Sequence, residues 1–453
     1  MAPPKQNTKR KPSKDSKRPE KRTPSAAPRR KAQADSTNNN DQDPNQIDVS
    51  GTIPITLQQL LLNVFKSALL PNETGSQDSE PNSEGSELDT KTLIQTIKSH
   101  LYNRDFDSAF ADAHESLLRA YALRWSAARA LGYAGLFKAL LKALVDEAGR
   151  DASAPTHVVC IGGGAGAEIV AFAAAWRDLI DEGVISRTEV KEGLSDALRA
   201  VSLDDKHDDR GGGKEKVVEE EEEQDARQKE SFSASSSSAS LSITAVDIAD
   251  WTAVVKRLSS TIQSTEVPGS RSHSAPLLPS TGSQNADADA APKRSFNVDF
   301  KRLDVLSLTD QDLNSLFRST KYPSTHSQPQ ASLVSLMFTL NELFSTSMAK
   351  ATSFLLRTTD ALSRGTFLLV VDSPGSYSTL KLKKESGTTQ ERQYPMKFLL
   401  DHALLSVAKG KWEKIYEQDS RWWRRDAARL VYDVGEGAGL EDMRFQIHVY
   451  RRV

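Results

Sequence analysis

The stretch HVVCIGGGAGAEIVAFA, residues 157–173, decides the fold class. Its first five residues are a short apolar run typical of a buried strand, five residues rich in glycine follow at once, and the remainder is typical of a helix. A strand, a glycine loop and a helix in this order form the first unit of a doubly wound sheet. We therefore predict an α/β domain built on a Rossmann-like sheet.

The glycine loop predicts a nucleotide site at the end of that strand. Glycine adopts the dihedral angles of such a turn at little cost and lets a ligand approach the backbone. The N–H groups of the following helix then face an anion, either a pyrophosphate or the carboxylate of S-adenosylmethionine. The spacing Gly162-x-Gly164-x-Gly166 suits the methyl donor, and Gly162-x-Gly164-x-x-Ala167 equally fits a dinucleotide site. The glycines alone leave both cofactors open.

Further apolar runs extend the sheet. We expect strands in Leu241–Asp247, in the strand and loop Phe296–Leu306, in Ser332–Phe338 and in Gly365–Asp372. Arg429–Val434 and Arg444–Tyr450 are interpreted as an antiparallel hairpin at the sheet edge.

Two acids follow predicted strands. Asp247 is placed to accept hydrogen bonds from both ribose hydroxyls, which either cofactor would use. Asp304 is placed where methyltransferases often hold the adenine amine, although a loop or helix cap explains it almost as well. Asp304 and the antiparallel hairpin favour the methyl donor. Tyr377-x-x-x-Lys381 has the spacing of short-chain dehydrogenases, but it follows a Pro-Gly turn too closely for a helix, and we interpret it as coincidence.

The remaining chain differs strongly in composition from the predicted sheet. Residues 1–50 are a basic tail that we expect to be disordered, either a nuclear-targeting and phosphate-attracting segment or a solvated tail. Residues 51–150 are predicted to be helical, with Thr56 capping a first helix up to Leu70. Residues 151–453 form the methyltransferase-like domain, interrupted by low-complexity insertions at about 202–240 and 259–293 that we expect to be disordered.

Composition excludes several classes of protein. The 453 residues are 38% hydrophobic, with a mean hydropathy of -0.51 and a net charge of -2. The one cysteine, Cys160, excludes an internal disulfide and a cysteine zinc site, so no metal is expected and a reducing compartment is favoured. Apolar runs are too short for a membrane span, and the N-terminus does not have the apolar core of a secretory signal.

Four phrases, together with the glycine loop, resemble one family. They are KSHLYNRDF at 98–106, YALRWS at 121–126, LMFTLNELF at 336–344 and LEDMRFQIHVY at 440–450. The chain resembles the fungal large-subunit ribosomal RNA uridine-N3 methyltransferases, a Rossmann-like family dependent on S-adenosylmethionine. The resemblance implies a sheet of roughly seven strands and action on ribosomal RNA or a pre-ribosomal particle. It also implies a nuclear and above all nucleolar location, with the cytoplasm as an alternative.

Methylation at N3 of uracil is consistent with the residues at hand. C5 chemistry would need a cysteine nucleophile, and Cys160 is expected to be buried and inert. The Asn/Asp-Pro-Pro-Tyr motif used on exocyclic amines is missing, and Asn341 and Glu342 follow the fourth predicted strand instead. Glu342 is the candidate acceptor of the N3 proton and Asn341 the candidate contact to a uracil carbonyl. A purely structural role for Glu342 in shaping the loop is the alternative.

Other residues carry predictions of their own. Arg124 and Trp125, and the run Trp422–Arg425, are candidates for holding an unstacked base, with helix or sheet packing as the alternative. A nicotinamide-dependent oxidoreductase and a non-enzymatic ribosome-assembly factor are the alternative functions. The predicted cofactor-binding residues are Gly162, Gly163, Gly164, Gly166, Glu168, Asp247, Asp304 and Phe338.

Overall fold

The computed structural model describes residues 47–70, 89–103, 105–148, 156–185, 240–279, 295–318, 330–383 and 389–453. The basic tail up to residue 46, nearly all of the predicted insertion at 202–240 and residues 280–293 of the second predicted insertion lie outside the described residues.

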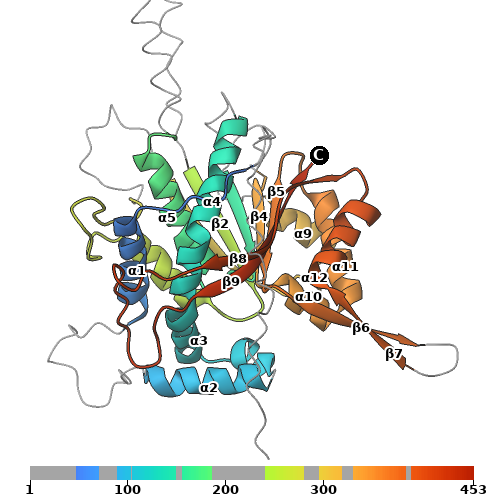
Figure 1. Cartoon of the computed structure of the whole chain (residues 1–453), viewed down its shortest axis with the longest axis horizontal. Coiled ribbons are helices and arrows are strands. Elements are labelled where there is room, and N and C mark those ends of the chain that lie inside the picture. Colours follow the sequence, from blue (N-terminus) through green and yellow to red (C-terminus); the bar gives the residue numbers. More distant parts are fainter. Residues whose placement is uncertain are drawn as a thin grey trace, which may run out of the picture. The chain divides into compact units, whose positions relative to one another are not determined.

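Seven strands form one sheet in the described part of the chain (Figure 1). They are β1 (Thr156–Ile161), β2 (Ser240–Asp247), β3 (Ser295–Arg302), β4 (Leu333–Met337), β5 (Phe367–Asp372), β8 (Trp412–Trp423) and β9 (Met443–Arg452). Their order is β3-β2-β1-β4-β5-β9-β8. Strands β1 to β5 are parallel, and β9 lies antiparallel between β5 and β8. The predicted Rossmann-like α/β sheet with antiparallel C-terminal strands is confirmed.

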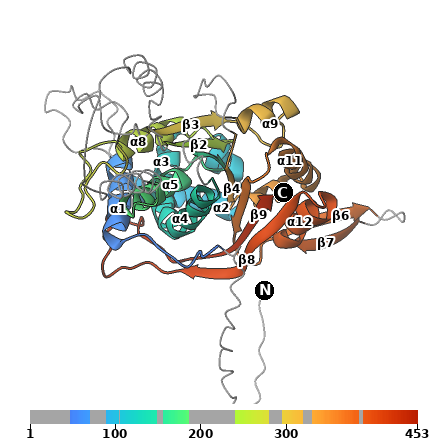
Figure 2. The same ribbon diagram turned by 90° about the horizontal axis from the view of Figure 1, so that it is seen from above.

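Alternation along the strands creates two separate apolar layers. In β1, Val158 and Cys160 face one layer and Val159 and Ile161 face the other, as the two-residue period of a strand requires. Helices cover both faces of the sheet (Figure 2). The first layer is covered by α1 (Ile55–Leu69), α4 (Ala127–Ala148), α5 (Ala167–Asp181) and α8 (Thr252–Ile262), and the second by α9 (Asp310–Leu316), α10 (Leu340–Thr346), α11 (Met348–Ala361) and α12 (Met396–Asp401).

Shorter elements complete the described chain. They are α2 (Thr90–Tyr102), α3 (Glu115–Tyr121), the π-helical segments η1 (Asp107–Ala111), η2 (Ala122–Ser126) and η4 (His402–Val407), and the hairpin of β6 (Tyr377–Lys383) and β7 (Thr389–Pro395). Tyr377 and Lys381 lie on strand β6, so the dehydrogenase-like spacing is not helical, as predicted. None of the described helices combines the length and apolar character that crossing a membrane requires.

The N-terminal helices share an apolar core with the sheet. The ring of Phe137 on α4 stacks on that of Phe172 on α5, with 3.7 Å between centroids. Buried side chains of α1 and α4 belong to the same cluster as those of β1, β2 and β5. The helical region at 51–150 therefore forms part of the wall around the sheet, and its division from residue 151 onward stays a prediction.

Three local predictions are wrong. Arg429–Val434 is a loop, and the partner of β9 is β8, whose polar sequence hides a strand at the sheet edge. Thr56 does not cap the first helix, which begins at Ile55 after Pro54; the Thr56 hydroxyl instead lies 2.7 Å from Nδ1 of His273.

The first half of the predicted insertion at 259–293 belongs to the packed structure, which is the third correction. Helix α8 continues to Ile262, and Leu277 and Leu278 in the following loop are buried in the core. The serine- and proline-rich composition of this stretch led to the prediction of disorder, although it contains two leucines that pack into the core.

Candidate active site

The carboxyl ends of β1, β2, β4 and β5 meet at one edge of the sheet, since these strands are parallel neighbours. The glycine loop follows β1, Asp247 ends β2, Phe338 and Asn341 follow β4, and Asp372 ends β5. Residues distant in sequence are thus brought to a single edge, where ligands of open α/β sheets bind.

The glycine loop has the left-handed backbone angles that its composition predicted. Gly162 has φ of 79° and Gly166 has φ of 83°, both in the left-handed region that favours glycine. The amide of Gly162 donates to the carbonyl of Val246 on β2, at 2.7 Å. Gly166 is the residue before α5, so the loop delivers the chain directly to the helix N-terminus.

Space around the glycines is taken by neighbouring side chains, a packing role that adds to the predicted ligand approach. A Cβ at Gly164 would lie 2.0 Å from Cδ1 of Trp251, and one at Gly162 would lie 2.1 Å from Oγ1 of Thr339. Trp251 is buried at the start of α8. The glycines therefore let the loop sit tightly against the elements that follow β2 and β4.

Asp247 is joined directly to the glycine loop. Its Oδ2 accepts a hydrogen bond from the Gly164 amide at 3.2 Å, and its Oδ1 accepts one from the Ala249 amide at 3.1 Å. Each carboxylate oxygen keeps a further lone pair for a ligand hydroxyl. Burial raises the pKa of Asp247, and the two amide donors oppose this shift. The next residue, Ile248, exposes 54% of its surface and offers an apolar contact beside the acid.

Glu168, in the first turn of α5, is buried next to a cation from the N-terminal helices. Burial raises the pKa of Glu168 to about 8, and the nearby charge of Arg129 works in the other direction. Arg129 on α4 donates to the hydroxyl of Tyr121 at 2.9 Å, and its guanidinium carbon lies 5.4 Å from the ring centroid of Phe338. Sequence reasoning missed Arg129 because an arginine on a helix has no local mark that separates it from a surface charge.

The segment after β4 is strained and polar. Phe338 has φ of 59°, which costs a non-glycine residue about 1–2 kcal/mol, and its ring lies over that of Tyr133 at 6.5 Å. The Thr339 hydroxyl donates to the carbonyl of Ile161 at 3.1 Å, which ties this segment to β1. Backbone strain of this kind gathers at binding and catalytic sites.

Asn341 and Asp372 form the next part of the edge. The backbone N–H of Asn341 donates to Oδ2 of Asp372 at 3.1 Å. Burial raises the pKa of the Asp372 carboxyl. The side-chain Oδ1 of Asn341 is buried without a hydrogen-bond partner among the described residues. Burying an amide oxygen without a hydrogen-bond donor costs folding free energy. The Asn341 oxygen therefore marks a place where a donor from a ligand would complete the hydrogen bonding. Glu342, the next residue, is exposed on α10. Asp372 was missed although it follows an apolar strand as Asp247 does.

Asp304 is bound to its own loop. Its Oδ1 accepts from the Leu306 amide at 3.0 Å and its Oδ2 from the Ser307 hydroxyl at 2.5 Å, and the residue is exposed. This geometry is that of the loop cap considered as the alternative, and a contact to adenine stays a prediction.

The candidate RNA-contacting residues divide into packed and exposed side chains. Arg124 is buried, donates to the carbonyl of Gly439 at 3.0 Å and pairs with Glu441. Trp125 is half-buried against the ring of Tyr121, 4.8 Å away. Trp422, in contrast, exposes 51% of its surface.

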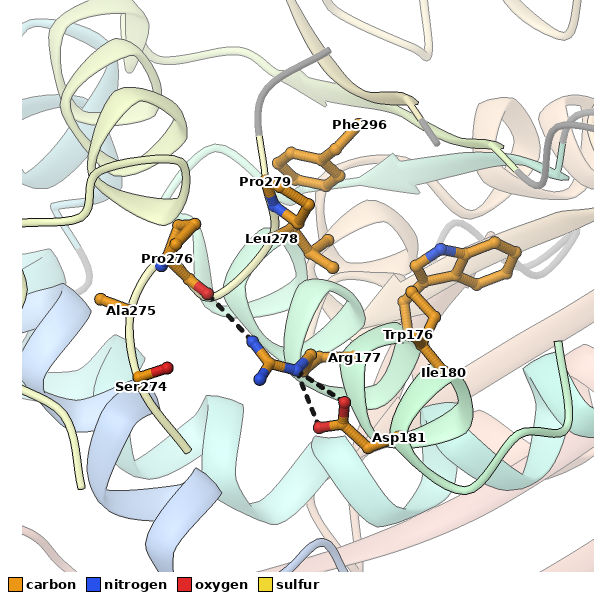
Figure 3. A pocket seen from close by; sticks show the side chains of 10 residues that line it. All are labelled: Trp176, Arg177, Ile180, Asp181, Ser274, Ala275, Pro276, Leu278, Pro279 and Phe296. Carbon is orange, nitrogen blue, oxygen red and sulfur yellow. Dashed lines mark hydrogen bonds and ion pairs between the residues drawn. The ribbon is translucent and has the colours of Figure 1, made fainter. Parts of the chain in front are cut away.

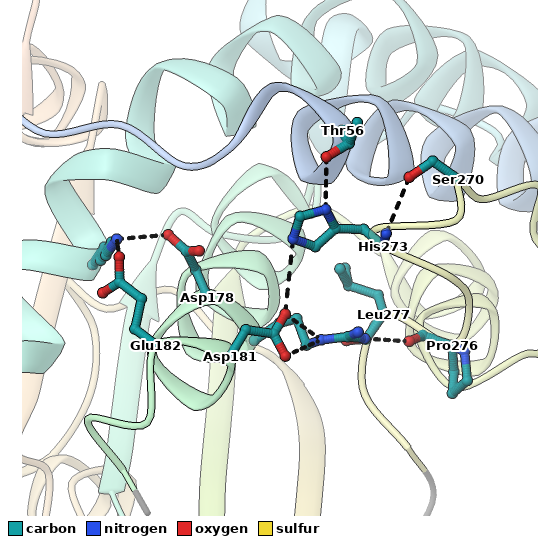
Figure 4. A network of polar contacts seen from close by, with 10 residues as sticks. Thr56, Asp178, Asp181, Glu182, Ser270, His273, Pro276 and Leu277 are labelled. Carbon is teal, nitrogen blue, oxygen red and sulfur yellow. Dashed lines mark hydrogen bonds and ion pairs between the residues drawn. The ribbon is translucent and has the colours of Figure 1, made fainter. Parts of the chain in front are cut away.

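The opposite, amino edge of the sheet has a cavity of a different kind. Figure 3 shows this space of about 330 Å³ between the last turns of α5, the loop at 274–279 and Phe296 at the start of β3. Arg177 crosses it, donating to Asp181 at 2.8 Å and to the carbonyl of Pro276 at 3.0 Å. His273 links Thr56 of α1 with Asp181, whose Oδ2 lies 3.9 Å from Nε2 (Figure 4). These contacts join α1, α5 and the loop, and their polar groups are already paired.

Comparison with known proteins identifies the family. A family model described as a SAM-dependent methyltransferase matches residues 75–451, more than half of the chain.

The chain belongs to this SAM-dependent methyltransferase family.

The methyltransferase is 29% identical over 401 residues to the "25S rRNA (uridine(2843)-N(3))-methyltransferase" of Saccharomyces cerevisiae, covering 86% of this chain and 85% of the relative. Among solved structures it is similar to an O-methyltransferase family protein from Burkholderia thailandensis (10% identity, 80% and 70% of the two chains, TM-score 0.29). It is also similar to SAM-bound CalS10, an amino pentose methyltransferase from Micromonospora echinaspora (10% identity, 69% and 90%, TM-score 0.23). The strand order, rather than these low TM-scores, identifies the fold.

S-adenosylmethionine is the cofactor of this methyltransferase, and the residues at the carboxyl edge fit it. The carboxylate of Asp247 keeps lone pairs for ribose hydroxyls, and the exposed Ile248 beside it suits an adenine ring. Arg129 is a cation near the start of α5, where the carboxylate of the methionine moiety would bind. Among the described residues, no three His, Cys, Asp and Glu side chains gather to hold a metal ion.

Proposed function

We propose that this methyltransferase acts on RNA and methylates N3 of a uridine in large-subunit ribosomal RNA. The observation that carries the proposal is the likeness to the yeast enzyme, whose printed activity is this one and which matches this chain over 401 residues. The oxidoreductase alternative receives no support, since the matching family uses S-adenosylmethionine.

The proposed cofactor contacts follow from the carboxyl edge. Backbone amides of the first turn of α5, where Glu168 lies, are the proposed donors to the methionine carboxylate. Gly162, Gly164 and Gly166, whose own amides bond within the protein, let the cofactor approach the loop. Asp247 accepts the ribose hydroxyls, Asp304 is proposed near the adenine, and Phe338 and Gly163 line the cradle. When bound, S-adenosylmethionine supplies a methyl group on a sulfonium centre.

The proposed chemistry at the base needs positioning and a proton acceptor. A methyl group replaces the N3 proton of uracil, so that proton must leave as the new bond forms. Asn341 has a side-chain amide whose buried oxygen has no partner among the described residues. Its side-chain NH2 group is the proposed donor to a uracil carbonyl. Glu342 follows on the exposed side of α10 and is the proposed acceptor of the N3 proton.

Cys160 does not take part in this chemistry. It is fully buried inside β1, and burial raises the pKa of its thiol well above the usual range. A thiolate attack on C6 of the pyrimidine, which C5 methylation would use, is therefore disfavoured.

The test is a nucleoside analysis of the reaction product. Full-length protein is incubated with S-adenosylmethionine and unmodified large-subunit ribosomal RNA, both free and within pre-ribosomal particles, and the digested RNA is examined by mass spectrometry. We expect 3-methyluridine at one position. Formation of 5-methyluridine, or S-adenosylmethionine binding without any RNA methylation, would refute the proposal. The second of these results would instead favour a non-enzymatic assembly factor.

Two substitutions on α10 test the catalytic roles. Glu342→Gln is expected to lower kcat by about 100-fold or more, the usual contribution of a general base, and Asn341→Ala to raise the KM for RNA as well. Both variants should bind S-adenosylmethionine as the parent does. Ser345→Ala, an exposed change on the same helix, is the matched control. An unchanged kcat in Glu342→Gln assigns Glu342 to loop structure only.

We also propose that the protein works in the nucleus, above all in the nucleolus, on a pre-ribosomal particle. The basic clusters of residues 1–50 support this proposal by their charge. Imaging of the tagged full chain, compared with a chain whose basic clusters are replaced by Ser, tests it. Unchanged nucleolar signal would assign the targeting to another part of the chain.

A further inference from the structure

Trp422 and Trp423 are neighbours at the end of β8 with opposite environments. Successive side chains of a strand point to opposite faces. Trp423 is half-buried, and its ring lies with Met443 over Gly132 of α4, where a Cβ would come within 3.5 Å of the indole. Trp422 exposes 51% of its surface. Packing of the core therefore explains Trp423 but does not explain the exposed ring of Trp422.

Two guanidinium groups lie close to the exposed indole. The guanidinium carbon of Arg424 is 4.0 Å from the ring centroid of Trp422, and that of Arg444 is 5.7 Å away. Arg424 donates from Nη1 to Asp442 at 2.6 Å, and Arg444 donates from Nε to the Ser420 hydroxyl at 2.8 Å. These contacts fix both groups, and within the described chain they use one nitrogen of each guanidinium. The remaining N–H groups are available for a ligand.

The strand register places this cluster at the edge that holds the active site. Asp372, the last residue of β5, pairs with Gln446 of β9, and Arg444 lies two residues beyond that pair. Trp422 is the partner of Arg444 on β8. Arg444 therefore lies past the carboxyl end of β5 on the neighbouring strand, and Trp422 lies one strand further out on β8.

The charge of this corner is positive. Residues 420–425 and 442–444 contain four arginines and one acid, Asp442. The flanking acids are paired with cations: Asp419 with Lys397, Asp426 with Arg429, and Glu441 with the buried Arg124. An exposed ring held between guanidinium groups fits a polyanion that also has flat rings, which is the chemistry of single-stranded nucleic acid.

We propose that Trp422, Arg424 and Arg444 bind a single-stranded segment of the RNA that carries the target base. The indole and guanidinium planes stack with an unpaired base, and the outward N–H groups bind the flanking phosphates. This inference rests on the proposed RNA substrate. It adds a substrate contact outside the cofactor site, at the side of the sheet formed by β8 and β9.

The test measures binding of the full-length protein to labelled single-stranded oligouridine by fluorescence anisotropy. Trp422→Ala is expected to raise Kd about 5- to 100-fold, the effect of losing one stacked base. Trp422→Phe keeps a ring and should recover most of the affinity. Lys411→Ala, a half-exposed charge removed at the opposite end of the same strand pair, is the matched control and should change little.

Salt dependence separates phosphate binding from stacking. The double variant Arg424→Ala/Arg444→Ala should lower the slope of log K against log salt by roughly 0.7 for each phosphate that the variant no longer binds. Trp422→Ala should leave that slope nearly unchanged. An unchanged slope in the double variant would overturn the assignment of these arginines to phosphates.

S-adenosylmethionine binding and methylation of ribosomal RNA, measured on the same preparations, separate this inference from the proposed function. Parental affinity for oligouridine in Trp422→Ala, with cofactor binding and methylation intact in the parent, would overturn the RNA contact and leave the function standing. Equal weakening toward duplex RNA would also overturn stacking on a single strand. Absence of methylation in the parent would refute the function itself.

Discussion

The two edges of the same parallel sheet hold polar clusters of opposite character. At the carboxyl edge, burial raises the pKa of Glu168, Asp247 and Asp372, and Asn341 has a buried oxygen without a partner in the described structure. At the amino edge, Asp181 is engaged by both Arg177 and His273. Unmet hydrogen bonding and strain are tolerated where a ligand completes the site, and paired groups serve where only stability is required.

His157, at the start of β1, is an exception at the amino edge, because it is a buried polar side chain without a paired group in the described chain. It is buried, both ring nitrogens are without partners among the described residues, and burial lowers its pKa to about 4. Its side chain is therefore neutral at physiological pH and packs as a polarisable ring.

The largest expected effect is at the acid that joins β2 to the glycine loop. Asp247→Ala removes the acceptor for two ribose hydroxyls and should weaken S-adenosylmethionine binding roughly 100- to 1,000-fold, measured by calorimetry. Asp250→Ala removes an exposed acid three residues away, which bonds only to Thr252 among the described residues, and should leave the affinity within about twofold. Equal losses of S-adenosylmethionine affinity in both variants would contradict the assignment of the cofactor site to the carboxyl edge.

The next effect tests the close packing of the glycine loop. Gly164→Ala places a Cβ against the buried indole of Trp251 and should lower the free energy of unfolding by about 1–3 kcal/mol. It should also weaken S-adenosylmethionine binding, by less than Asp247→Ala does. Gly439→Ala meets open space and is the control. A Gly164→Ala variant as stable as the Gly439→Ala variant would contradict the tight fit.

A third effect depends on pH and on Glu168. Its pKa is about 8 in the folded state and 4.5 as an ordinary carboxyl, so between these values the folded state holds a proton that the unfolded state has lost. Stability therefore falls as pH rises from about 4.5 to 8. The Glu168→Gln variant has no carboxyl at this position and does not show this pH dependence. As pH rises from about 4.5 to 8, its free energy of unfolding relative to that of the parent should therefore increase by up to about 1.4 kcal/mol per pH unit. Urea unfolding of both proteins at several pH values measures this change. A difference in unfolding free energy that stays constant with pH would contradict the prediction.

The smallest effect is expected at the amino edge. Asp181→Ala breaks a partly exposed ion pair with Arg177 and should cost at most about 1 kcal/mol of unfolding free energy. S-adenosylmethionine affinity and methyl transfer should be unchanged. A clear loss of cofactor affinity in this variant would show that the two edges are coupled and would end the contrast between them.

Local sequence was sufficient to predict the structure and the candidate site residues where a residue's role depends on its own segment. The apolar run, the glycines and the helix at 157–173 together specify a parallel unit, and Asp247 is marked by its place at a strand end. Asp372 has the same mark and was available to the same reasoning. The family resemblance was equally local, since it depended on short phrases.

Sequence was insufficient where a role depends on a distant partner. Strand β8 is an edge strand with mostly half-exposed side chains, so its pattern gives little apolar signal, whereas the more apolar Arg429–Val434 packs Leu430 and Val434 into the core as a loop. Arg129 is positioned by contacts with Phe338 and Tyr121, and Phe338 is more than 200 residues away in sequence. Leu277 and Leu278 are anchors inside a stretch whose composition suggests disorder.

The insertion of β9 between β5 and β8 has a consequence for biosynthesis. While a nascent chain has emerged only as far as β8, strand β5 has β4 on one side and nothing on the other, and all six of its residues are apolar or destined for burial. Such an open edge recruits chaperones or other chains. Translation must therefore continue through residues 443–452 before β5, and the acid at its end, reach their final setting.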